Sequence, residues 1–415
     1  MTTLRTRGNM FTRRQFLYGS AAAVLATAAP ALLRASGVPL SHTASAQSAT
    51  ASAMPNIIFV VAEAMRADHL SSYGYERPTT PNLDAFMAAE GVRFDQATTA
   101  SSWTYPSNYA MLTGRMPSRI GIDWSDLQTT IPEEETMLAE YLRNTGYYTA
   151  GFVTNFYLGA NFGFSQGFDV YETLRGSEKA EDLNRLAMNW LEVQWATQSR
   201  AQPLFLFLYY YDPHTWYDPP PPYDTLYDSN YTGSLTPDVY QHGQAVVSGD
   251  IVPTPRDVEH LKALYDGEIT YLDHNFGQMM DYLDGMGLLD NSLIVVTSDH
   301  GQMFGEHGKW VHRNSLYEEV LRVPLLLRYD GVLPKDTVVA EPVSHTDLLP
   351  TILDLIGLPV PGGLDGITLR AQAQGEPGNP DRPIYAEMES EPDLDSLGHW
   401  IAPPTDLRSV RQGEW

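Results

Sequence analysis

The sequence predicts an α/β fold in which helices cover both faces of a central, mostly parallel sheet. Three continuous apolar runs, at 56–62, 204–210 and 293–297, are typical of strands that are buried on both faces. Helical segments lie between these runs, and strands that alternate with helices form mostly parallel sheets. A chain of 415 residues, 43% of them hydrophobic, can bury such a core.

The first elements lead to a helix that begins near position 104. The apolar run 56–62 is the first strand, 79–89 is the first helix, and 92–97 is a short strand. A helix follows, because Pro106 suits a first helical turn and Gly114 suits a helix end.

The later elements alternate in the same way. A helix at 133–144 has acidic residues in its first turn and Gly146 after its end. The other expected elements are, in order, a strand at 147–153, a helix at 182–196, the strand at 204–210, a long loop region at 215–255, a helix at 258–286, strands at 293–297 and 323–328, and a helix at 346–356. A loop of such length in a compact domain usually carries function or is disordered.

Charge and cysteine content exclude several classes of protein. The net charge of −25 argues against nucleic acid as a partner, because nothing would neutralise its phosphates. A small phosphate-bearing substrate is compatible with this charge, since a bound metal can reverse the local field. The chain has no cysteine, which excludes a disulfide framework, a Cys-ligated structural zinc and a cysteine nucleophile.

The N-terminal segment has the features of an export signal. A twin-arginine pattern at 13–14 is followed by an apolar run at 17–33 and by small residues at 44–46. We expect residues 1–46 to be a signal peptide for the twin-arginine (Tat) export machinery and 47–54 to be a linker. The mature protein is then periplasmic or secreted. A single-pass membrane anchor is the alternative, although the run is Ala-rich and only weakly hydrophobic.

Thr104 is the candidate nucleophile. A hydroxyl at a helix N-terminus lies where backbone N–H groups point outward and the helix dipole is positive, which favours an oxyanion, a phosphate or a sulfate. A helix cap is the simpler interpretation of such a hydroxyl. The catalytic interpretation therefore depends on which other groups converge on Thr104.

Polar residues of metal-ligand type follow three of the buried strands, at the point where each strand ends. The carboxyl ends of parallel strands lie at one edge of the sheet, so these side chains are expected to converge. They are Glu63 after the first strand, Asp212 with His214 after the second, and Asp299 with His300 after the third.

We expect a divalent cation at this edge. The predicted ligands are Glu63, Asp299, His300 and the oxygen of Thr104. Mixed oxygen and nitrogen donors suit zinc or manganese better than calcium, although calcium is compatible. Whether a second metal site exists stays open, because spacing alone does not show it. Its candidate ligands are Asp212, His214, His307 and His312.

A cation at this position would activate Thr104. It lowers the pKa of the hydroxyl, and attack on phosphorus or sulfur then gives a covalent ester of Thr104. His214 and His312 are candidates to hold the transferred group or to protonate the leaving oxygen. Nearby ionisable residues, His307 and Lys309, are either functional or structural.

Several different short motifs follow one another in a characteristic order from Pro55 to the end of the chain. They include the segments 55–58, 66–70, 80–84, 112–115, 212–214, 297–301, 305–308, 316–319 and 364–366. This set resembles the sulfatase family, within the alkaline phosphatase superfamily. The resemblance implies an alkaline-phosphatase-like catalytic domain at 55–385 with a divalent cation at the carboxyl edge of its sheet. It also implies that 386–415 is the start of a C-terminal subdomain, apparently truncated.

Several positions depart from the sulfatase pattern. Sulfatases have a Cys or Ser, the precursor of formylglycine, where this chain has Thr104, and they have an arginine where it has Asn108. Glu63 replaces an Asp, and Asn155 and Tyr157 replace an expected Lys and His. These departures favour a phosphoester over a sulfate ester.

The ligand set instead resembles that of lipoteichoic acid synthases and phosphoethanolamine transferases, which use a threonine nucleophile on phosphodiesters. We therefore predict an exported, metal-dependent hydrolase that cleaves a phospho-, phosphono- or sulfo-ester, which a glycan or lipid can carry. A phospho-group transferase and a non-catalytic binding protein are the alternatives. The predicted substrate-binding residues are Asn108, Asn155, His307, Lys309 and Arg313.

Overall fold

The computed structural model describes residues 54–121, 129–176, 178–197, 202–215, 217–233, 235, 243, 245–389, 393–394, 400–402 and 406–413. The expected signal peptide, 1–46, lies outside the described residues, as does all of the expected linker except its last residue. Within the described residues, no helix combines the length and the apolar character that a membrane crossing needs.

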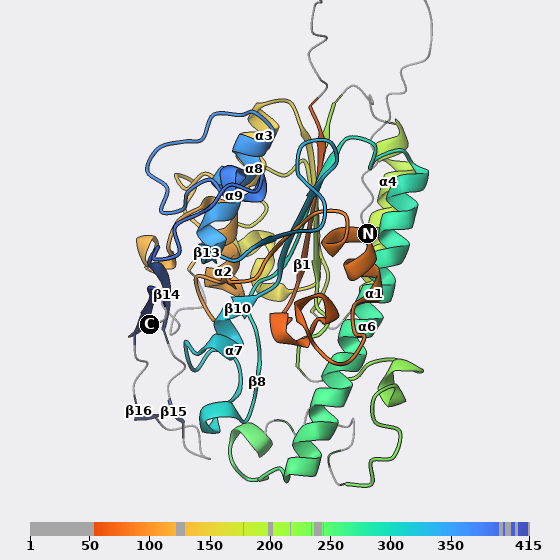
Figure 1. Cartoon of the computed structure of the whole chain (residues 1–415), viewed down its shortest axis with the longest axis vertical. Coiled ribbons are helices and arrows are strands. Elements are labelled where there is room, and N and C mark those ends of the chain that lie inside the picture. The colour runs from red at the N-terminus through yellow and green to blue at the C-terminus, as the bar shows by residue number, and fades with distance from the viewer. Residues whose placement is uncertain are drawn as a thin grey trace, which may run out of the picture. The chain divides into compact units, whose positions relative to one another are not determined.

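A central sheet of eight strands organises the fold, in the order β12-β2-β11-β7-β1-β6-β4-β5 (Figure 1). Its strands are β1 (Asn56–Ala62), β2 (Val92–Phe94), β4 (Tyr148–Val153), β5 (Val170–Thr173), β6 (Leu204–Tyr210), β7 (Ser292–Ser298), β11 (Leu325–Tyr329) and β12 (Thr337–Val339). Strand β1 pairs in parallel with β6 and β7, whereas β11 is antiparallel to both of its neighbours. The sheet is therefore mostly parallel, as predicted.

Helices cover both faces of this sheet. They are α1 (Pro81–Leu83), α2 (Thr104–Thr113), α3 (Leu138–Asn144), α4 (Ala180–Val193), α6 (Pro255–Gly285), α7 (Glu318–Leu321), α8 (Leu348–Leu355) and α9 (Arg370–Ala373). Figure 1 shows α4 and α6 on one face of the sheet and α2, α3 and α8 on the other.

Alternate residues of β1 pack into two separate cores. Ile57, Phe59 and Val61 contact the core under α2, α3 and α8, whereas Ile58 and Val60 contact the core under α4 and α6. Side chains alternate between the two faces of a strand, so a continuous apolar run fills both cores. The apolar runs read from the sequence are thus strands buried on both faces, and the predicted fold class is confirmed.

The expected helix at 79–89 differs from the prediction. It begins as a single α-turn at Pro81 and continues as a π-helix over Asp84–Ala88. The expected helix at 133–144 is shorter at its start, because α3 begins at Leu138.

Smaller sheets complete the chain. Strands β3 (Ala97–Thr98), β10 (Arg322–Val323) and β13 (Val343–Ser344) form one of them, and β8 (Met303–Phe304) and β9 (Trp310–Val311) form a hairpin. Near the C-terminus, β14 (Ile384–Glu389) pairs antiparallel with β17 (Asp406–Arg411), and β15 (Asp393–Leu394) pairs antiparallel with β16 (Trp400–Ala402). The expected small C-terminal subdomain is therefore present as antiparallel strands.

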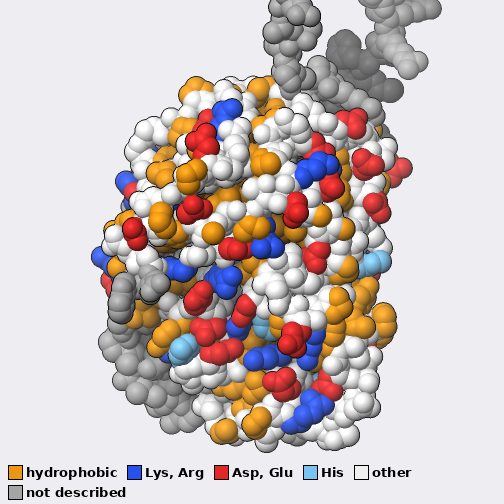
Figure 2. Space-filling view, in the orientation of Figure 1, with side chains coloured by type: hydrophobic (Ala, Val, Ile, Leu, Met, Phe, Trp, Pro, Cys, Tyr) orange, Lys and Arg blue, Asp and Glu red, His pale blue; other side chains and the backbone are white. Residues whose placement is uncertain are grey.

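The charges of the surface are mixed. On the face that Figure 2 shows, Lys and Arg side chains are interspersed with Asp and Glu. No single basic patch stands out among the described residues on that face.

Candidate active site and metal centre

Two adjacent strands and one helix bring the four predicted metal ligands together. Glu63 follows β1, and Asp299 and His300 follow β7, which pairs in parallel with β1 up to its last residue. Helix α2 begins at Thr104. All four side chains are buried, with exposures of 0% for the first three and 3% for Thr104. The convergence predicted for these residues is therefore observed.

The cluster has the geometry of a metal site. One ligand atom from each of Glu63, Asp299 and His300 lies within 4.8 Å of the other two. The Thr104 hydroxyl donates a hydrogen bond of 2.9 Å to Glu63 Oε1, which places Thr104 beside these ligands. This is the one group of acidic and histidine side chains among the described residues that suits a metal ion.

The donor atoms fit a divalent cation. Glu63 Oε2 and His300 Nε2 are buried and have no hydrogen-bond partner. His300 Nδ1 donates to Gly301 O over 2.9 Å, so the lone pair of Nε2 is the one available to a metal. Burial, with the charge of Asp299 as the second cause, raises the pKa of Glu63 well above its ordinary value. A bound cation would offset both causes.

Asp299 is held by hydrogen bonds from several sides. The Tyr209 hydroxyl donates to Oδ2 over 2.7 Å, and the backbone N–H groups of Ala64 and His300 donate to Oδ1 over 3.1 and 2.8 Å. The sequence analysis missed Tyr209 because it lies inside the apolar run that forms β6. The sequence carries no signal for this contact, because the neighbouring Tyr210 has the same hydroxyl and points to the opposite core.

The two asparagines that depart from the sulfatase pattern support the predicted metal ligands. Asn155 Nδ2 donates to Glu63 Oε1 over 2.6 Å. Asn108, one helical turn after Thr104, donates from Nδ2 to Thr104 O over 2.8 Å and to Asp299 Oδ2 over 3.3 Å. Their predicted role in substrate binding stays a prediction, whereas their contacts with the carboxylates are observed.

Two histidines lie beside the cluster. His214 Nε2 lies 3.7 Å from Glu63 Oε1, and the ring centres of His214 and His312 are 5.0 Å apart. The ring of His312 also lies 4.4 Å from that of His300. Burial, followed by the charge of His300, lowers the pKa of His214 to about 3 and lowers the pKa of His312 well below its ordinary value. Both imidazoles are therefore neutral at pH 7.

Asp212 does not join this cluster, contrary to the expectation from its place after β6. Its Oδ2 accepts a hydrogen bond of 2.8 Å from the N–H of Ala180 in the first turn of α4, and its Oδ1 lies 3.8 Å from Lys179 Nζ. Lys179 also pairs with the buried Glu268, at 3.0 Å. Asp212 thus contacts a helix N-terminus and a nearby lysine instead of the metal ligands.

Arg313 and Lys309 are two further residues that the sequence predicted to bind substrate. The Arg313 guanidinium carbon lies 4.3 Å from the centre of the Trp103 ring, which precedes Thr104, and its charge acts on both His214 and His312. Lys309 lies in the loop between β8 and β9.

His307 is exposed at the surface and does not join the cluster. Its ring stacks on Tyr317 at 3.8 Å, and its Nε2 lies 3.2 Å from Glu319 Oε1. The second metal site that the sequence left open is not assembled from Asp212, His214, His307 and His312, because Asp212 and His307 each contact other partners.

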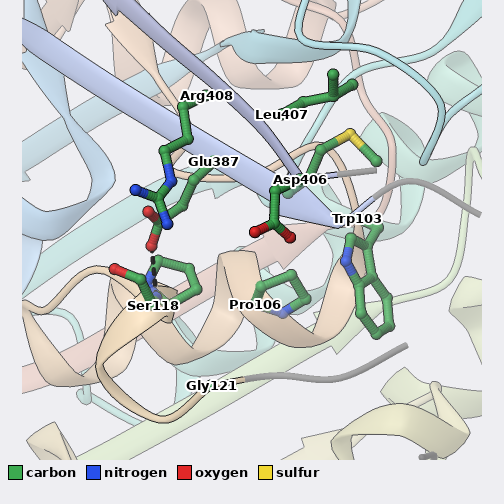
Figure 3. A pocket seen from close by; sticks show the side chains of 10 residues that line it. Trp103, Pro106, Ser118, Gly121, Glu387, Asp406, Leu407 and Arg408 are labelled. Atoms are coloured by element: carbon green, nitrogen blue, oxygen red, sulfur yellow. Dashed lines mark hydrogen bonds between the residues drawn. The ribbon is translucent and has the colours of Figure 1, made fainter. Parts of the chain in front are cut away.

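A cavity of about 170 Å³ borders α2 on another side (Figure 3). Trp103 and Pro106 line it, together with residues of β14 and β17 that include Glu387, Asp406 and Arg408. None of the predicted metal ligands is among the residues that line this cavity.

The described residues thus combine a mostly parallel α/β sheet with one candidate metal site at its carboxyl edge. The model of the sulfatase family matches residues 55–358. This chain belongs to the sulfatase family.

Curated relatives agree with this assignment. An ulvan-active sulfatase of Formosa agariphila is 27% identical over 335 residues, which cover 75% of this chain and 63% of that protein. This chain thus spans less than two thirds of the length of that relative. An N-acetylglucosamine-6-O-sulfatase of Bacteroides thetaiotaomicron is 24% identical over 78% of this chain and 71% of its own length.

Solved structures share the fold. A protein in complex with D-glucosamine-2-N,6-O-disulfate superposes with a TM-score of 0.70 at 20% identity, covering 87% of each chain. A phosphonate monoester hydrolase from Silicibacter pomeroyi superposes with a TM-score of 0.67 at 23% identity, covering 87% of this chain and 90% of that one. At these identities the comparison establishes the fold alone.

Proposed function

We propose that this chain is an exported hydrolase that cleaves a monoanionic ester of phosphorus or sulfur through a covalent intermediate on Thr104, with phosphodiesters and phosphonate monoesters favoured over sulfate esters. The observation that carries the proposal is the Thr104 hydroxyl at the N-terminus of α2, 2.9 Å from Glu63 Oε1 within the metal-ligand cluster. Export is inferred from the twin-arginine pattern within residues 1–46.

The residues of the chain provide the parts of such a reaction. When bound, a divalent cation at Glu63, Asp299 and His300 would lower the pKa of the hydroxyl and stabilise negative charge on the transferred group. Thr104 Oγ1 forms a bond to phosphorus or sulfur while the bond to the leaving oxygen breaks. The hydroxyl proton passes to His214 Nε2, which lies near the Glu63 oxygen that orients the hydroxyl, and from there to the leaving oxygen.

The charges around Thr104 favour a monoanionic group. The carboxylates of Glu63 and Asp299 would balance the charge of one divalent cation, and the two neighbouring histidines are neutral. Arg313 is the cation whose charge acts on both histidines. A net charge of about one positive unit complements a phosphodiester, a phosphonate monoester or a sulfate ester better than the dianion of a phosphate monoester.

Two further points support the choice of ester. Threonine cannot become formylglycine, which the resemblance to sulfatases implies for sulfate hydrolysis, so Thr104 favours phosphorus. Several relatives are named for activity on sulfated carbohydrates, which supports a small or glycan-linked ester as the substrate.

The test is turnover of a panel of p-nitrophenyl esters by metal-loaded protein: phosphate monoester, phosphodiester, phosphonate monoester and sulfate. We expect diester or phosphonate turnover that disappears in Thr104→Ala and in a chelated sample. Thr113→Ala is the matched control, because its hydroxyl bonds only within α2, to Tyr109 O at 2.7 Å. Dominant sulfate turnover, or full activity of Thr104→Ala, would refute the proposal.

A transferase that uses the same site is the second candidate. The ligand set resembles that of threonine-dependent phospho-group transferases, and an alcohol can resolve a Thr104 ester as water does. Added glycerol or glucose should then divert the transferred group from free phosphate or phosphonate to the alcohol. Product analysis at equal turnover separates the two candidates.

A further inference from the structure

Gln302 is a fully buried polar residue that connects the two histidine-bearing loops. It lies between Asp299-His300 and the β8–β9 hairpin, and its exposed fraction is 0%. Its side chain reaches His312 on one side and Thr215 and Tyr217, which follow His214, on the other. A buried amide must satisfy both its donors and its acceptor, so these contacts define its role.

Both polar atoms of the amide have partners. Gln302 Nε2 donates to the Tyr217 hydroxyl over 2.7 Å and to Thr215 Oγ1 over 3.2 Å. Its Oε1 lies 2.8 Å from His312 Nδ1. An amide oxygen only accepts hydrogen bonds, so the neutral imidazole of His312 carries its proton on Nδ1 and presents a bare lone pair on Nε2.

His214 has the same tautomer for a similar reason. Its Nδ1 donates to the carbonyl of Thr215 over 2.6 Å, so its Nε2, 3.7 Å from Glu63 Oε1, is also a bare lone pair. Thr215 thus contacts His214 through its carbonyl and Gln302 through its hydroxyl. One short network thus fixes the ring orientation of both histidines, which lie beside Glu63 and His300.

We infer that Gln302 is a positioning residue: it fixes His312 in the Nδ1–H tautomer, so that Nε2 accepts the proton of the water that resolves the Thr104 ester. In this step, which rests on the proposed function, a bond forms between the water oxygen and phosphorus as the bond from phosphorus to Thr104 Oγ1 breaks. The electron pair stays on Oγ1. The proton of the water moves to His312 Nε2 and then to Oγ1, which restores the hydroxyl.

The first test reads the tautomer without any turnover. In metal-free protein labelled with ¹⁵N-histidine, long-range ¹H–¹⁵N spectra distinguish the two neutral tautomers, and His312→Gln identifies the signal. We expect the Nδ1–H form in the wild type and in Gln302→Glu, which keeps an acceptor oxygen. We expect a mixture in Gln302→Met. An Nε2–H form in the wild type, or an unchanged tautomer in Gln302→Met, overturns the inference.

The second test is kinetic. Loss of a residue that orients an active-site histidine costs about 10–100-fold, and we expect kcat of Gln302→Met to fall by that factor with little change in KM. The Thr104 ester should accumulate in acid-quenched samples, where mass spectrometry detects it. Gln278→Met is the matched control, because this exposed glutamine also bonds a histidine, His274, but far from Thr104 on α6.

The outcomes separate this inference from the proposed function. A loss confined to KM, or a lower kcat without ester accumulation, overturns the positioning role. Absence of any Thr104 ester in an active wild type refutes the covalent mechanism instead, and the tautomer spectra still decide the role of Gln302. If Gln302→Met does not fold, Tyr217→Phe removes the hydroxyl that holds the amide, and a partial shift of the His312 tautomer is then expected.

Discussion

Replacing Tyr209 with Phe should weaken metal binding without disturbing the metal ligands themselves. The Tyr209 hydroxyl donates to Asp299 Oδ2 over 2.7 Å in a fully buried environment, and Phe keeps the ring while removing that donor. A hydrogen bond to a charged group contributes about 1.5–3 kcal/mol. The remaining donor to this oxygen, Asn108 Nδ2, lies farther away, at 3.3 Å.

The size of the effect follows from these contacts. A loss of about 1.5–3 kcal/mol in the free energy that holds the Asp299 carboxylate in place corresponds to a factor of about 10–100 in metal affinity. Residues that hold metal ligands have effects in the same range. We therefore expect the Kd for zinc or manganese to rise about 10–100-fold in Tyr209→Phe. Competition with a chromophoric chelator measures this change directly, without a substrate.

The neighbouring residue provides the control. The Tyr210 hydroxyl is equally buried but points to the opposite core, where it donates to Asn184 Oδ1 over 2.6 Å. Tyr210→Phe should lower stability by about 1 kcal/mol and leave metal affinity unchanged. If Tyr209→Phe binds metal within twofold of the wild type, or if Tyr210→Phe loses as much affinity, the assigned role of Tyr209 is wrong.

Two other predictions concern metal removal and pH. Chelation should lower the Tm of the wild type, because a ligand present at 100 times its Kd stabilises the fold by about 2.7 kcal/mol. In Asp299→Asn, chelation should leave the Tm unchanged. An equal shift of Tm in both proteins would contradict the assignment of Asp299 as a metal ligand. Burial raises the pKa of Glu268 to about 8, against the opposing charge of Lys179. Because the folded-state pKa lies above the ordinary value of 4.5, the contribution of Glu268 is fully present below about pH 4.5 and is lost as the pH rises through about 8. Urea denaturation between pH 5 and 8.5 should show a weaker loss of stability in Glu268→Gln than in the wild type, and equal pH dependence would exclude this residue as the cause.

The part of the site that the sequence predicted is the part that strand order determines. Glu63, Asp299 and His300 follow apolar runs. The carboxyl ends of adjacent parallel strands lie at the same edge of the sheet, whatever the conformation of the connecting loops. Asp212 follows an apolar run as well, yet its carboxylate contacts the first turn of α4 and Lys179. The position of this carboxylate depends on how α4 packs beside β6, and no local sequence pattern predicts that packing.

The residues that orient the site were not predictable in this way. Tyr209 lies within an apolar run, where an aromatic residue indicates a strand and not a hydrogen-bond donor. Gln302 has no ligand or catalytic spacing, and only the observed contacts with His312, Thr215 and Tyr217 identify its role. Residues that act through hydrogen-bond geometry thus become visible only in the folded structure.

The burial of the two carboxylates has a consequence for the choice of metal. Glu63 and Asp299 are both fully buried, and burying charges is costly unless a partner of opposite charge compensates for them. Metal binding should therefore be coupled to folding of this edge of the sheet. Because the expected Tat route exports proteins already folded, we expect the cation to enter before export. Metal availability contributes to selectivity among zinc, manganese and other divalent ions, so the cytoplasmic supply should then decide which ion the exported protein holds.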